Sequence, residues 1–418
     1  MTDAATVLTT DRADCIDCGR PHALAADSQG CSCPALGNLA VRYRLDGDMS
    51  RALRESVAAG EPSLWRYAPL LPVSRKFASH LAVGWTPLLD CGAVGGARLL
   101  LKDETRNPSG SLKDRATEIV VAVAAAAGVR RVIVASTGNA AASLACIGAA
   151  AGLDVTVIVP DSVPPAKLAQ VLAYGARVHR VAGRYDDAYV MAARIAEAEG
   201  IANRSTGRNP FTREGKKTCA FEIVEQLGWQ APEWVIVPTG DGNILSAIWK
   251  GFRELVALGL LDSAPRLVAA QAEASSVIAA RHEGRAGGGG DGATIADSIN
   301  VGEPRDATAA LAALAESRGL AVVVDDSQIV AAVSALASRF GVFAEPSSAA
   351  AFAAFEKLQA GRCFEPGDRV VCLVTGTGLK DLRPVLGAAA SDAAPAVDPA
   401  EWRSLLAAPV AAPLPAPA

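Results

Sequence analysis

The sequence of 418 residues is poor in aromatic side chains and carries no excess of positive charge. Aromatic residues make up 5% of the chain although half of it is hydrophobic, so the apolar content is mainly alanine, valine, leucine and isoleucine. That mixture favours helices packed on buried strands over an aromatic-rich β-sandwich. The formal net charge of −4 argues against a protein that binds nucleic acid or an anionic membrane, because such a surface is normally basic.

Long hydrophobic runs are also missing. The best candidate, Ile119–Val129, is too short to span a bilayer and consists largely of alanine and valine. The N-terminal stretch MTDAATVLTTDRADC contains acidic residues and no apolar segment, so no signal peptide is visible and we expect a cytoplasmic protein. Wholesale disorder is excluded because a chain of this length and apolar content can bury large cores.

Nine cysteines in a chain of cytoplasmic character are not expected to form a disulfide framework. Four form two close pairs, Cys15 with Cys18 and Cys31 with Cys33, as in half of a zinc ribbon. A single residue separates the second pair, which makes it harder to direct both thiolates at one tetrahedral centre. A zinc site and a knuckle that has lost its metal therefore both remain open. The other five lie in apolar settings and are expected to be small buried residues: Cys91, Cys146, Cys219, Cys363 and Cys372.

Short apolar runs alternate with stretches of helical period from about residue 95 onwards. The runs predict buried parallel strands at 98–102, 132–135, 155–159, 178–181, 235–237, 267–270, 322–324 and 370–374. The stretches between them predict helices at 114–127, 140–151, 165–174, 185–198 and 213–227. This alternation indicates an α/β fold in which helices cover both faces of parallel-rich sheets. Ligands of such folds lie beyond the carboxyl ends of the strands, so site residues are expected in the loops that follow them.

The sequence divides into five predicted segments. They are a cysteine knuckle at 1–40, a lead-in at 41–94, two α/β domains at 95–205 and 206–387, and a tail rich in alanine and proline at 388–418. The glycine-rich stretch 285–292 predicts a flexible loop, and residues 399–407 of the tail predict a short helix.

Lys113 lies where a strand, a Pro-Ser-Gly-Ser turn and the start of a helix follow one another. The positive end of a helix dipole disfavours a cation there, which lowers the pKa of the amine. A neutral amine is the nucleophile that a Schiff base requires. A solvated surface lysine is the alternative interpretation.

A second junction, Ser136-Thr137-Gly138-Asn139, joins a strand to an alanine-rich helix. Amides at the helix start, together with the two hydroxyls, form a pocket suited to a carboxylate. The amide of Asn139 can donate to a phenolate oxygen. Ordinary N-capping by serine or threonine is the alternative.

A third junction, Gly240-Asp241-Gly242-Asn243, is rich in glycine. Residues without a Cβ let backbone amides close on a phosphate. Asp241 would repel that phosphate unless its side chain points away and accepts amides of the loop.

Two further segments carry single polar groups. Thr375 follows the last strand, where its hydroxyl could face an unprotonated ring nitrogen, although a plain glycine-containing turn is the alternative. Glu345 precedes a helix of small residues, which it either caps or holds in place.

A nucleophilic lysine, a phosphate loop, an amide for a phenolate and a hydroxyl for a pyridine nitrogen are the groups that pyridoxal phosphate needs. The chain resembles the fold-type-II pyridoxal-phosphate enzymes over roughly residues 12–385, and within them the threonine synthase family. The resemblance lies in SLWRYAPLLP, GWTPLL, NPSGSLKDR, ASTGN, NPFTREGKKT, VPTGDGN, FAEPSSAAA and VTGTGLKD, in that order. It implies a fold like the tryptophan synthase β-subunit with the cofactor in the interdomain cleft. It also implies a homodimer that acts on a small amino-acid substrate, with no nucleic-acid or membrane partner.

The resemblance also implies roles for single residues. Lys113 would hold pyridoxal phosphate as a Schiff base and serve as the catalytic base, Asn139 would contact its phenolate oxygen, and Thr375 would face its pyridine nitrogen. The loop around the cofactor phosphate would be formed by Gly240, Asp241, Gly242 and Asn243. The substrate carboxylate would be held by Ser136, Thr137 and Gly138.

The segment 203–213 departs from the family pattern. Members that use phosphohomoserine usually carry an Asn-Ser pair before the Asn-Pro and an arginine soon after it, whereas Thr206-Gly207 and Thr212 stand in those places here. Arg208 or Arg213 could replace the missing cation at the substrate phosphate, since arginine grips phosphate in bidentate fashion, or both are surface charges.

The leading hypothesis is conversion of O-phospho-L-homoserine and water to L-threonine and phosphate by a lyase of the threonine synthase kind. A related β-replacing synthase resembling cysteate synthase, or an amino-acid ammonia-lyase, is the alternative that the altered segment raises. A zinc-ribbon binding protein without catalytic activity is a third class, which the acidic charge balance and the cofactor-type turns disfavour.

Overall fold

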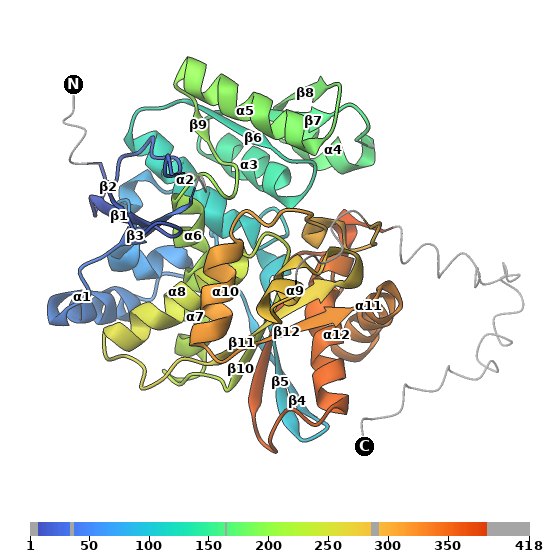
Figure 1. The fold of residues 1–418 in the computed structure, drawn as a ribbon. Helices are drawn as coiled ribbons and strands as arrows, with labels where there is room; N and C mark the ends of the chain where they lie inside the picture. The colour runs from blue at the N-terminus through green and yellow to red at the C-terminus, as the bar shows by residue number, and fades with distance from the viewer. Residues whose placement is uncertain (1–6, 34–36, 164, 286–291, 383–418) are drawn as a thin grey trace, which may run out of the picture.

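The alternating pattern folds into two α/β units, one above the other in Figure 1. The computed structural model describes residues 7–33, 37–163, 165–285 and 292–382. The predicted tail 388–418 with its short helix, and residues 286–291 of the glycine-rich stretch, lie outside the described residues.

The larger unit is built on a six-stranded sheet in the order β12-β11-β10-β13-β5-β4. Its strands are β4 (Leu88–Val94), β5 (Ala97–Asp103), β10 (Trp234–Pro238), β11 (Arg266–Ala272), β12 (Leu320–Val324) and β13 (Arg369–Val374). Neighbouring strands are parallel except β4, which is antiparallel to β5.

Strand β5 does not follow the predicted division of the chain at residue 95. It pairs with β13 in this sheet, so the first predicted strand of the N-terminal α/β domain belongs with the later strands. The pairing places Leu99 and Leu101 on one face with Val370 and Cys372, and Leu100 on the other face with Val371. A strand that is apolar on both faces is stabilised inside a covered sheet, which explains its position.

Helices cover both faces of the six-stranded sheet. Along β10, Val235 and Val237 point to one face and Ile236 to the other, as the period of a strand requires. The first face packs against α7 (Thr218–Gln226), α8 (Asn243–Ala257), α9 (Val277–His282) and α10 (Ala307–Glu316). The second packs against α11 (Asp326–Phe340) and α12 (Pro346–Ala360).

The smaller unit contains a four-stranded parallel sheet in the order β8-β7-β6-β9. Its strands are β6 (Arg131–Ala135), β7 (Asp154–Pro160), β8 (Arg177–Val181) and β9 (Ala202–Asn203). One face packs against α2 (Lys113–Ala126), α3 (Asn139–Ala150) and α4 (Pro165–Ala173), and the other against α5 (Tyr185–Glu199). The predicted helix at 213–227 is present as α6 (Phe211–Lys216) and α7.

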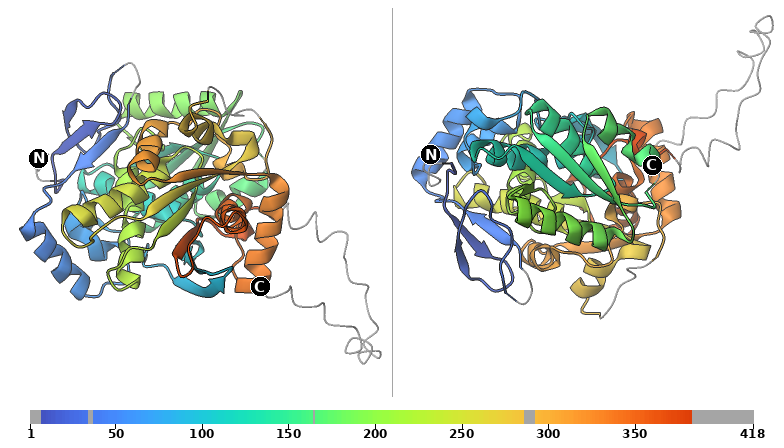
Figure 2. Two further views of the ribbon diagram at one scale, coloured as in Figure 1. Left: turned by 60° about the horizontal axis from the view of Figure 1, so that its bottom comes forward. Right: turned by 90° about the horizontal axis from the view of Figure 1, so that it is seen from above.

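The N-terminal segment forms a third, small antiparallel sheet at one side of the molecule (Figure 2). Its strands are β1 (Arg12–Cys15), β2 (Pro21–Ala23) and β3 (Leu39–Arg42), and α1 (Gly47–Ala58) follows. The short 3-10 helices are η2 (Leu64–Leu70), η3 (Arg75–Phe77), η4 (Glu104–Arg106), η5 (Glu273–Ser275), η6 (Asp297–Ile299) and η7 (Gly378–Lys380).

Four charged side chains are fully buried where α2 meets α7 and β5. Arg115 donates to Glu104 and Glu222, and Lys102 donates to Glu222 at 2.8 Å. The two cations and two anions balance one another, which is how charges are tolerated in a core. This buried ion network fixes the first turn of α2, the helix that begins with Lys113.

The cysteines outside the knuckle only partly follow the prediction. Cys146, Cys219 and Cys372 are buried, and Cys91 on the edge strand β4 is half-buried. Cys363 is exposed, so the prediction was wrong there, because this residue lies in the surface turn that follows α12.

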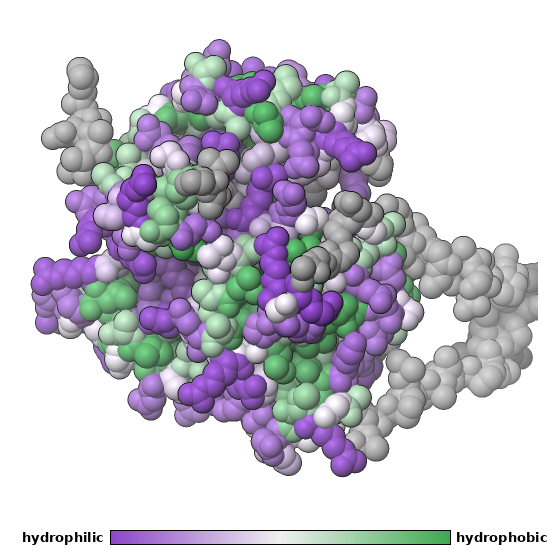
Figure 3. Space-filling view, viewed as in Figure 1, coloured by the Kyte–Doolittle hydropathy of each residue, from purple (hydrophilic) through white to green (hydrophobic). Residues whose placement is uncertain are grey.

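No helix in the described part of the chain is both long and apolar enough to cross a membrane. The face shown in Figure 3 is mainly hydrophilic, with apolar atoms gathered over its lower half, in front of the six-stranded sheet.

Candidate active site

Lys113 is the first residue of α2, and its side chain lies among charged groups from both units. Burial lowers the pKa of its amine and the positive charge of Arg204 lowers it further, while Glu345 and Asp241 oppose the shift. Among the described residues, its amine has no hydrogen-bond partner. A neutral amine without a partner is the form that adds to a carbonyl carbon.

The turn before Lys113 is fastened to the loop after β13. The amide of Leu112 donates to the carbonyl of Thr375 at 2.9 Å, and the amide of Thr377 donates to the carbonyl of Gly110 at 3.0 Å. Gly110 has a φ of +82°, and a Cβ there would lie 2.8 Å from Cγ2 of Thr377. Only glycine therefore allows both the turn and the close approach.

The glycine-rich loop after β10 leads into α8, whose N-cap residue is Gly242 with a φ of +86°. A Cβ at Gly240 would lie 2.9 Å from Cα of Ile299, so the loop is too tightly enclosed for a side chain there. The carboxylate of Asp241 accepts the backbone amide of Arg305 at 3.2 Å, which belongs to another segment and not to the glycine-rich loop itself. Amides at the start of this helix of 15 residues form a cradle for an anion.

Asn139 and Glu345 meet from opposite units. The side-chain nitrogen of Asn139 donates to both carboxylate oxygens of Glu345, at 2.8 and 3.0 Å. Glu345 stands at the N-cap position of α12 but makes no side-chain capping bond, and its carboxylate instead holds Asn139 of the other unit. Burial raises the pKa of Glu345, an effect that the bond from Asn139 opposes.

The hydroxyl of Thr375 lies at the carboxyl end of β13, 2.9 Å from the hydroxyl of Ser348 on α12. The amide of Gly376 donates to the same Ser348 oxygen at 2.7 Å. Thr375 is thus oriented by a helix of the large unit and, through Leu112, fastened to the turn that carries Lys113.

A cleft of about 590 Å³ opens between the two units. Thr137, Gly138 and Asn139 line it from the small unit, and Glu345 and Lys380 line it from the large one. The predicted carboxylate pocket therefore faces open space at the N-terminus of α3. Ser136, although not part of the lining, accepts the amide of Gly138 at 3.2 Å and shapes this turn.

Lys113 and the loop 240–243 do not line that cleft. The amine of Lys113 interacts electrostatically with Glu345 at the cleft and with Asp241 in the loop. Its amine is therefore within electrostatic range of a carboxylate at the cleft and of another in the glycine-rich loop.

The two arginines suggested for a substrate phosphate lie in different surroundings. Arg208 is exposed at the surface. Arg213 is buried and donates to both oxygens of Asp306, at 2.6 and 2.5 Å. A buried ion pair of this kind already satisfies Arg213, which disfavours its role at a substrate phosphate, whereas the role of Arg208 stays a prediction.

Arg204, which the sequence analysis passed over, is a fully buried cation beside Lys113. It donates to the hydroxyls of Thr117 and Thr206, at 3.1 and 3.0 Å, and to the backbone carbonyl of Lys113. Burial lowers the pKa of Arg204 to about 10, with no carboxylate in hydrogen-bond contact among the described residues.

Lys216 is a second buried cation that the motifs did not single out. Its amine donates to the side-chain oxygen of Asn243 at 2.5 Å. Burial lowers its pKa well below the ordinary value, and the charges of Lys113 and Arg204 lower it further. Because buried charges are costly without a counter-charge, the two buried cations Arg204 and Lys216 near Lys113 indicate a site for an anion.

Two buried hydroxyls in these segments also lack partners. The oxygens of Ser111, in the turn before Lys113, and of Ser205, next to Arg204, have no hydrogen bond within the described ranges. Unpartnered buried polar atoms in both segments are what a site built for a polar ligand would show.

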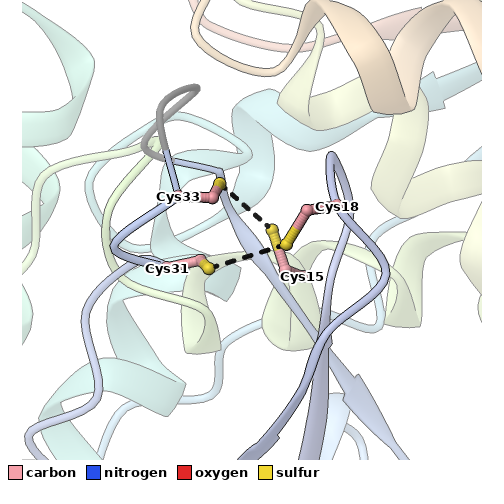
Figure 4. A group of neighbouring side chains, drawn as sticks. All are labelled: Cys15, Cys18, Cys31 and Cys33. Carbon is pink, nitrogen blue, oxygen red and sulfur yellow. Dashed lines mark hydrogen bonds between the residues drawn. The ribbon is translucent and has the colours of Figure 1, made fainter.

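The four N-terminal cysteines converge on one point (Figure 4). The sulfur of Cys15 lies 3.8 Å from that of Cys33, the sulfur of Cys18 lies 3.8 Å from that of Cys31, and all four lie within 4.8 Å of one another. The single residue between Cys31 and Cys33 therefore does not prevent convergence. The cluster could bind a metal ion.

Comparison with known proteins agrees with this geometry. The family model of pyridoxal-phosphate dependent enzymes matches residues 80–376. The chain is 39% identical over 377 residues to a threonine synthase of Methanocaldococcus jannaschii, covering 88% of this chain and 92% of that protein. It is 37% identical over 382 residues to a threonine synthase of Methanosarcina acetivorans, covering 89% and 93%.

Among solved structures, maize serine racemase superposes with a TM-score of 0.62 at 20% identity, over 87% of this chain and 99% of that one. At that identity the likeness shows the fold alone. Taken with the sequence matches and the arrangement around Lys113, it leads to the conclusion that the chain belongs to the fold-type-II pyridoxal-phosphate-dependent enzymes and is similar to the threonine synthases among them.

Proposed function

We propose that the enzyme converts O-phospho-L-homoserine and water to L-threonine and phosphate, as a carbon–oxygen lyase acting on a phosphate. The observation that carries the proposal is the pair of buried cations, Arg204 and Lys216, beside Lys113. The cofactor and the substrate each bring a phosphate. The amides at α8 suit the cofactor phosphate, Lys216 lies at the edge of that loop through its bond to Asn243, and Arg204 lies farther along, on Thr117 and Thr206. A second anion site is what a phosphorylated substrate requires and an unphosphorylated amino acid does not.

The residues fit pyridoxal phosphate. Lys113 offers an amine with a lowered pKa, and Thr375 offers a hydroxyl fixed by Ser348. The loop at Gly240 has no room for a side chain at that position, so its backbone amides stay accessible to a phosphate. Asn139 offers an amide held by Glu345. When bound, pyridoxal phosphate supplies an electron sink that stabilises negative charge at the carbon next to the substrate amine.

Lys113 then serves as the acid–base group. When it is not bonded to the cofactor, its amine would take the proton from the α-carbon and later return one. Its lowered pKa increases the share of unprotonated amine, which is the form that a base requires. Arg204, which interacts with the amine electrostatically, maintains this condition.

Arg204 and Lys216 bind the substrate phosphate and stabilise the charge that it carries as it leaves. The substrate carboxylate lies at the N-terminus of α3, against the amides and hydroxyls of Ser136, Thr137 and Gly138. Walls from both units line the cleft, so closure of the units excludes water until the phosphate has left.

The test compares Arg204→Leu with Arg208→Leu, a matched change at an exposed arginine four residues away. Phosphate release from O-phospho-L-homoserine is measured under steady-state conditions. A hydrogen bond to a charged group contributes about 1.5–3 kcal/mol, so kcat/KM should fall about 10- to 100-fold for Arg204→Leu and stay unchanged for Arg208→Leu.

The opposite result would identify another substrate. If the unaltered enzyme binds its cofactor but releases no phosphate from O-phospho-L-homoserine, the proposal is wrong. Formation of ammonia from serine or threonine, or replacement at Cβ of another amino acid, would then point to the ammonia-lyase or the β-replacing synthase.

We also propose that the metal of the cysteine cluster is zinc. A tetrahedron with zinc–sulfur bonds of about 2.3 Å has sulfur–sulfur edges of about 3.8 Å, and two pairs of sulfurs lie at 3.8 Å here. Four thiolates without an oxygen or nitrogen ligand are typical of structural zinc. Elemental analysis of the purified chain should give one zinc per chain, and Cys18→Ser with Cys31→Ser should lose it.

A further inference from the structure

Asn38 connects the cysteine cluster to the large unit. It follows the last cysteine pair, and its carbonyl accepts the amide of Ile16 in the turn between Cys15 and Cys18. Its side-chain nitrogen donates to the carboxylate of Asp306 at 2.8 Å and to the carbonyl of Arg305 at 3.0 Å. Asn38 is buried, although 267 or more residues of chain separate it from these partners.

The backbone before Asn38 is packed against the sulfurs. The amide of Gly37 lies 3.5 Å from the sulfur of Cys33, and its carbonyl accepts the amide of Cys31 at 2.7 Å. A Cβ at Gly37 would lie only 2.5 Å from the sulfur of Cys15. The position of Asn38 therefore depends on where the sulfurs of Cys15 and Cys33 are held.

Asp306 links Asn38 to the phosphate loop. Its carboxylate also accepts from Arg213, from the side-chain nitrogen of Asn243 at 3.0 Å and from the hydroxyl of Ser246 at 2.7 Å. Its backbone amide donates to the carbonyl of Asp241 at 3.1 Å. One buried carboxylate thus fixes both the middle and the end of the loop 240–243.

Asn38 completes the set of donors around this carboxylate. Asp306 is almost fully buried, and burial opposes its charge. Arg213 neutralises that charge, and the remaining lone pairs need neutral donors. Without Asn38, one oxygen loses a donor, and the side chains of Arg213, Asn243 and Ser246 can shift to compensate.

We propose that zinc in the cysteine cluster positions the cofactor-phosphate loop through Asn38 and Asp306. Zinc holds the four sulfurs at tetrahedral distances, the sulfurs hold Gly37, and Gly37 holds Asn38 on Asp306. The cluster lies outside the site and touches no reacting atom, so Asn38 is a positioning residue. The inference rests on the proposed zinc and on the cofactor site at Lys113.

The experiment measures the dissociation constant for pyridoxal phosphate, by absorbance titration of full-length chain freed of cofactor. Three changes are compared: removal of zinc by chelation, Asn38→Ala with zinc present, and both together. Thr308→Val is the matched control, because it removes the exposed bond from Thr308 to Asp17 of the knuckle. Circular dichroism and zinc content are recorded for every sample.

Loss of one hydrogen bond to a charged group corresponds to about a tenfold change. Zinc removal and Asn38→Ala should therefore each raise the dissociation constant about tenfold. Zinc removal from Asn38→Ala should add less than about twofold, because the two act through one contact. Asn38→Ala should keep its zinc, and Thr308→Val should bind the cofactor like the unaltered chain.

The inference is overturned if Asn38→Ala binds the cofactor normally, or if the two effects multiply. Where chelation unfolds the chain, Asn38→Ala with zinc bound decides alone. A chain that contains no zinc overturns the metal's part, whereas a chain that does not bind pyridoxal phosphate through Lys113 overturns the proposed function instead. These failures are distinguished by the zinc content and by the absorption of the Lys113→Ala variant.

Discussion

Glu222→Gln is expected to be one of the most destabilising conservative changes in the chain. Its carboxylate is fully buried and has no water to replace lost partners. It accepts five hydrogen bonds, from the backbone amides of Trp85 and Thr86, from Lys102, and twice from Arg115. Glutamine has the shape of glutamate but no charge. Its side-chain NH2 group would also face N–H donors that the carboxylate accepts.

The magnitude follows from the charge balance of the buried ion network. Lys102 and Arg115 are neutralised by Glu104 and Glu222, so after the change two buried cations share one anion. Breaking a buried pair in this way costs about 3–5 kcal/mol. Because a folded domain is stable by only about 5–15 kcal/mol, the loss should be a large fraction of the free energy of unfolding.

The assay is urea unfolding followed by circular dichroism, with Asp90→Asn as control. Asp90 pairs with Arg98 at the surface, where both side chains are largely exposed, so its loss should cost less than about 1 kcal/mol. The reasoning is refuted if the two variants unfold at similar urea concentrations. The comparison is valid only where the transition remains two-state.

The same carboxylate makes stability depend on pH. Burial would raise the pKa of Glu222, but Arg115 and Lys102 outweigh it and lower the pKa to about 2. A lowered pKa stabilises the fold above the ordinary value for glutamate, and this contribution is lost as the pH falls from about 4.5 towards 2. Glu222→Gln should therefore remove part of the acid sensitivity in that range.

Three further outcomes follow from the site. Lys113→Ala should abolish the visible absorption of bound cofactor while circular dichroism stays unchanged, and a band that survives would contradict its role. Arg204→Leu should raise the pKa of Lys113, since it removes a nearby positive charge, and should shift the pH dependence of cofactor uptake upward; an unshifted profile would argue against their interaction. Gly240→Ala places a Cβ 2.9 Å from Cα of Ile299 and should weaken cofactor binding, because overpacking costs about 1–3 kcal/mol. The control Gly47→Ala has open space around its Cβ and should leave cofactor binding unchanged.

The sequence predicted the local elements well because their signals are local. Each of the eight predicted strands is present to within about two residues, since buried runs bounded by turns are typical of parallel sheets. The assignment of β5 to the first domain failed because strand pairing depends on residues far apart in the chain: its partner β13 lies near the other end of the described residues. Periodicity contains no information about such pairing.

In the site, too, local features could be predicted from the sequence and long-range contacts could not. Candidate residues near Lys113 and Gly240 could be predicted because turns, glycines and helix starts are visible in sequence. Arg204 and Lys216 were missed because their significance is their burial without a carboxylate partner, which only packing reveals. Arg213 was misjudged for the complementary reason, since its partner Asp306 lies 93 residues away.

Two lysines lie near one another in this site, Lys216 buried and Lys113 half-buried, and their hydrogen bonds separate their roles. Lys216 donates to Asn243, which in turn donates to Asp306, so its amine is held by a chain of fixed side chains. An amine held in this way can bind an anion but would have to give up its bond to attack a carbonyl. Lys113 has no such bond to another described residue, so its amine is free to react. Its backbone, in contrast, is fixed by the turn at Thr375. Burial lowers the pKa of both, and it is therefore the hydrogen bonding rather than the acidity that assigns covalent attachment to Lys113 and phosphate binding to Lys216.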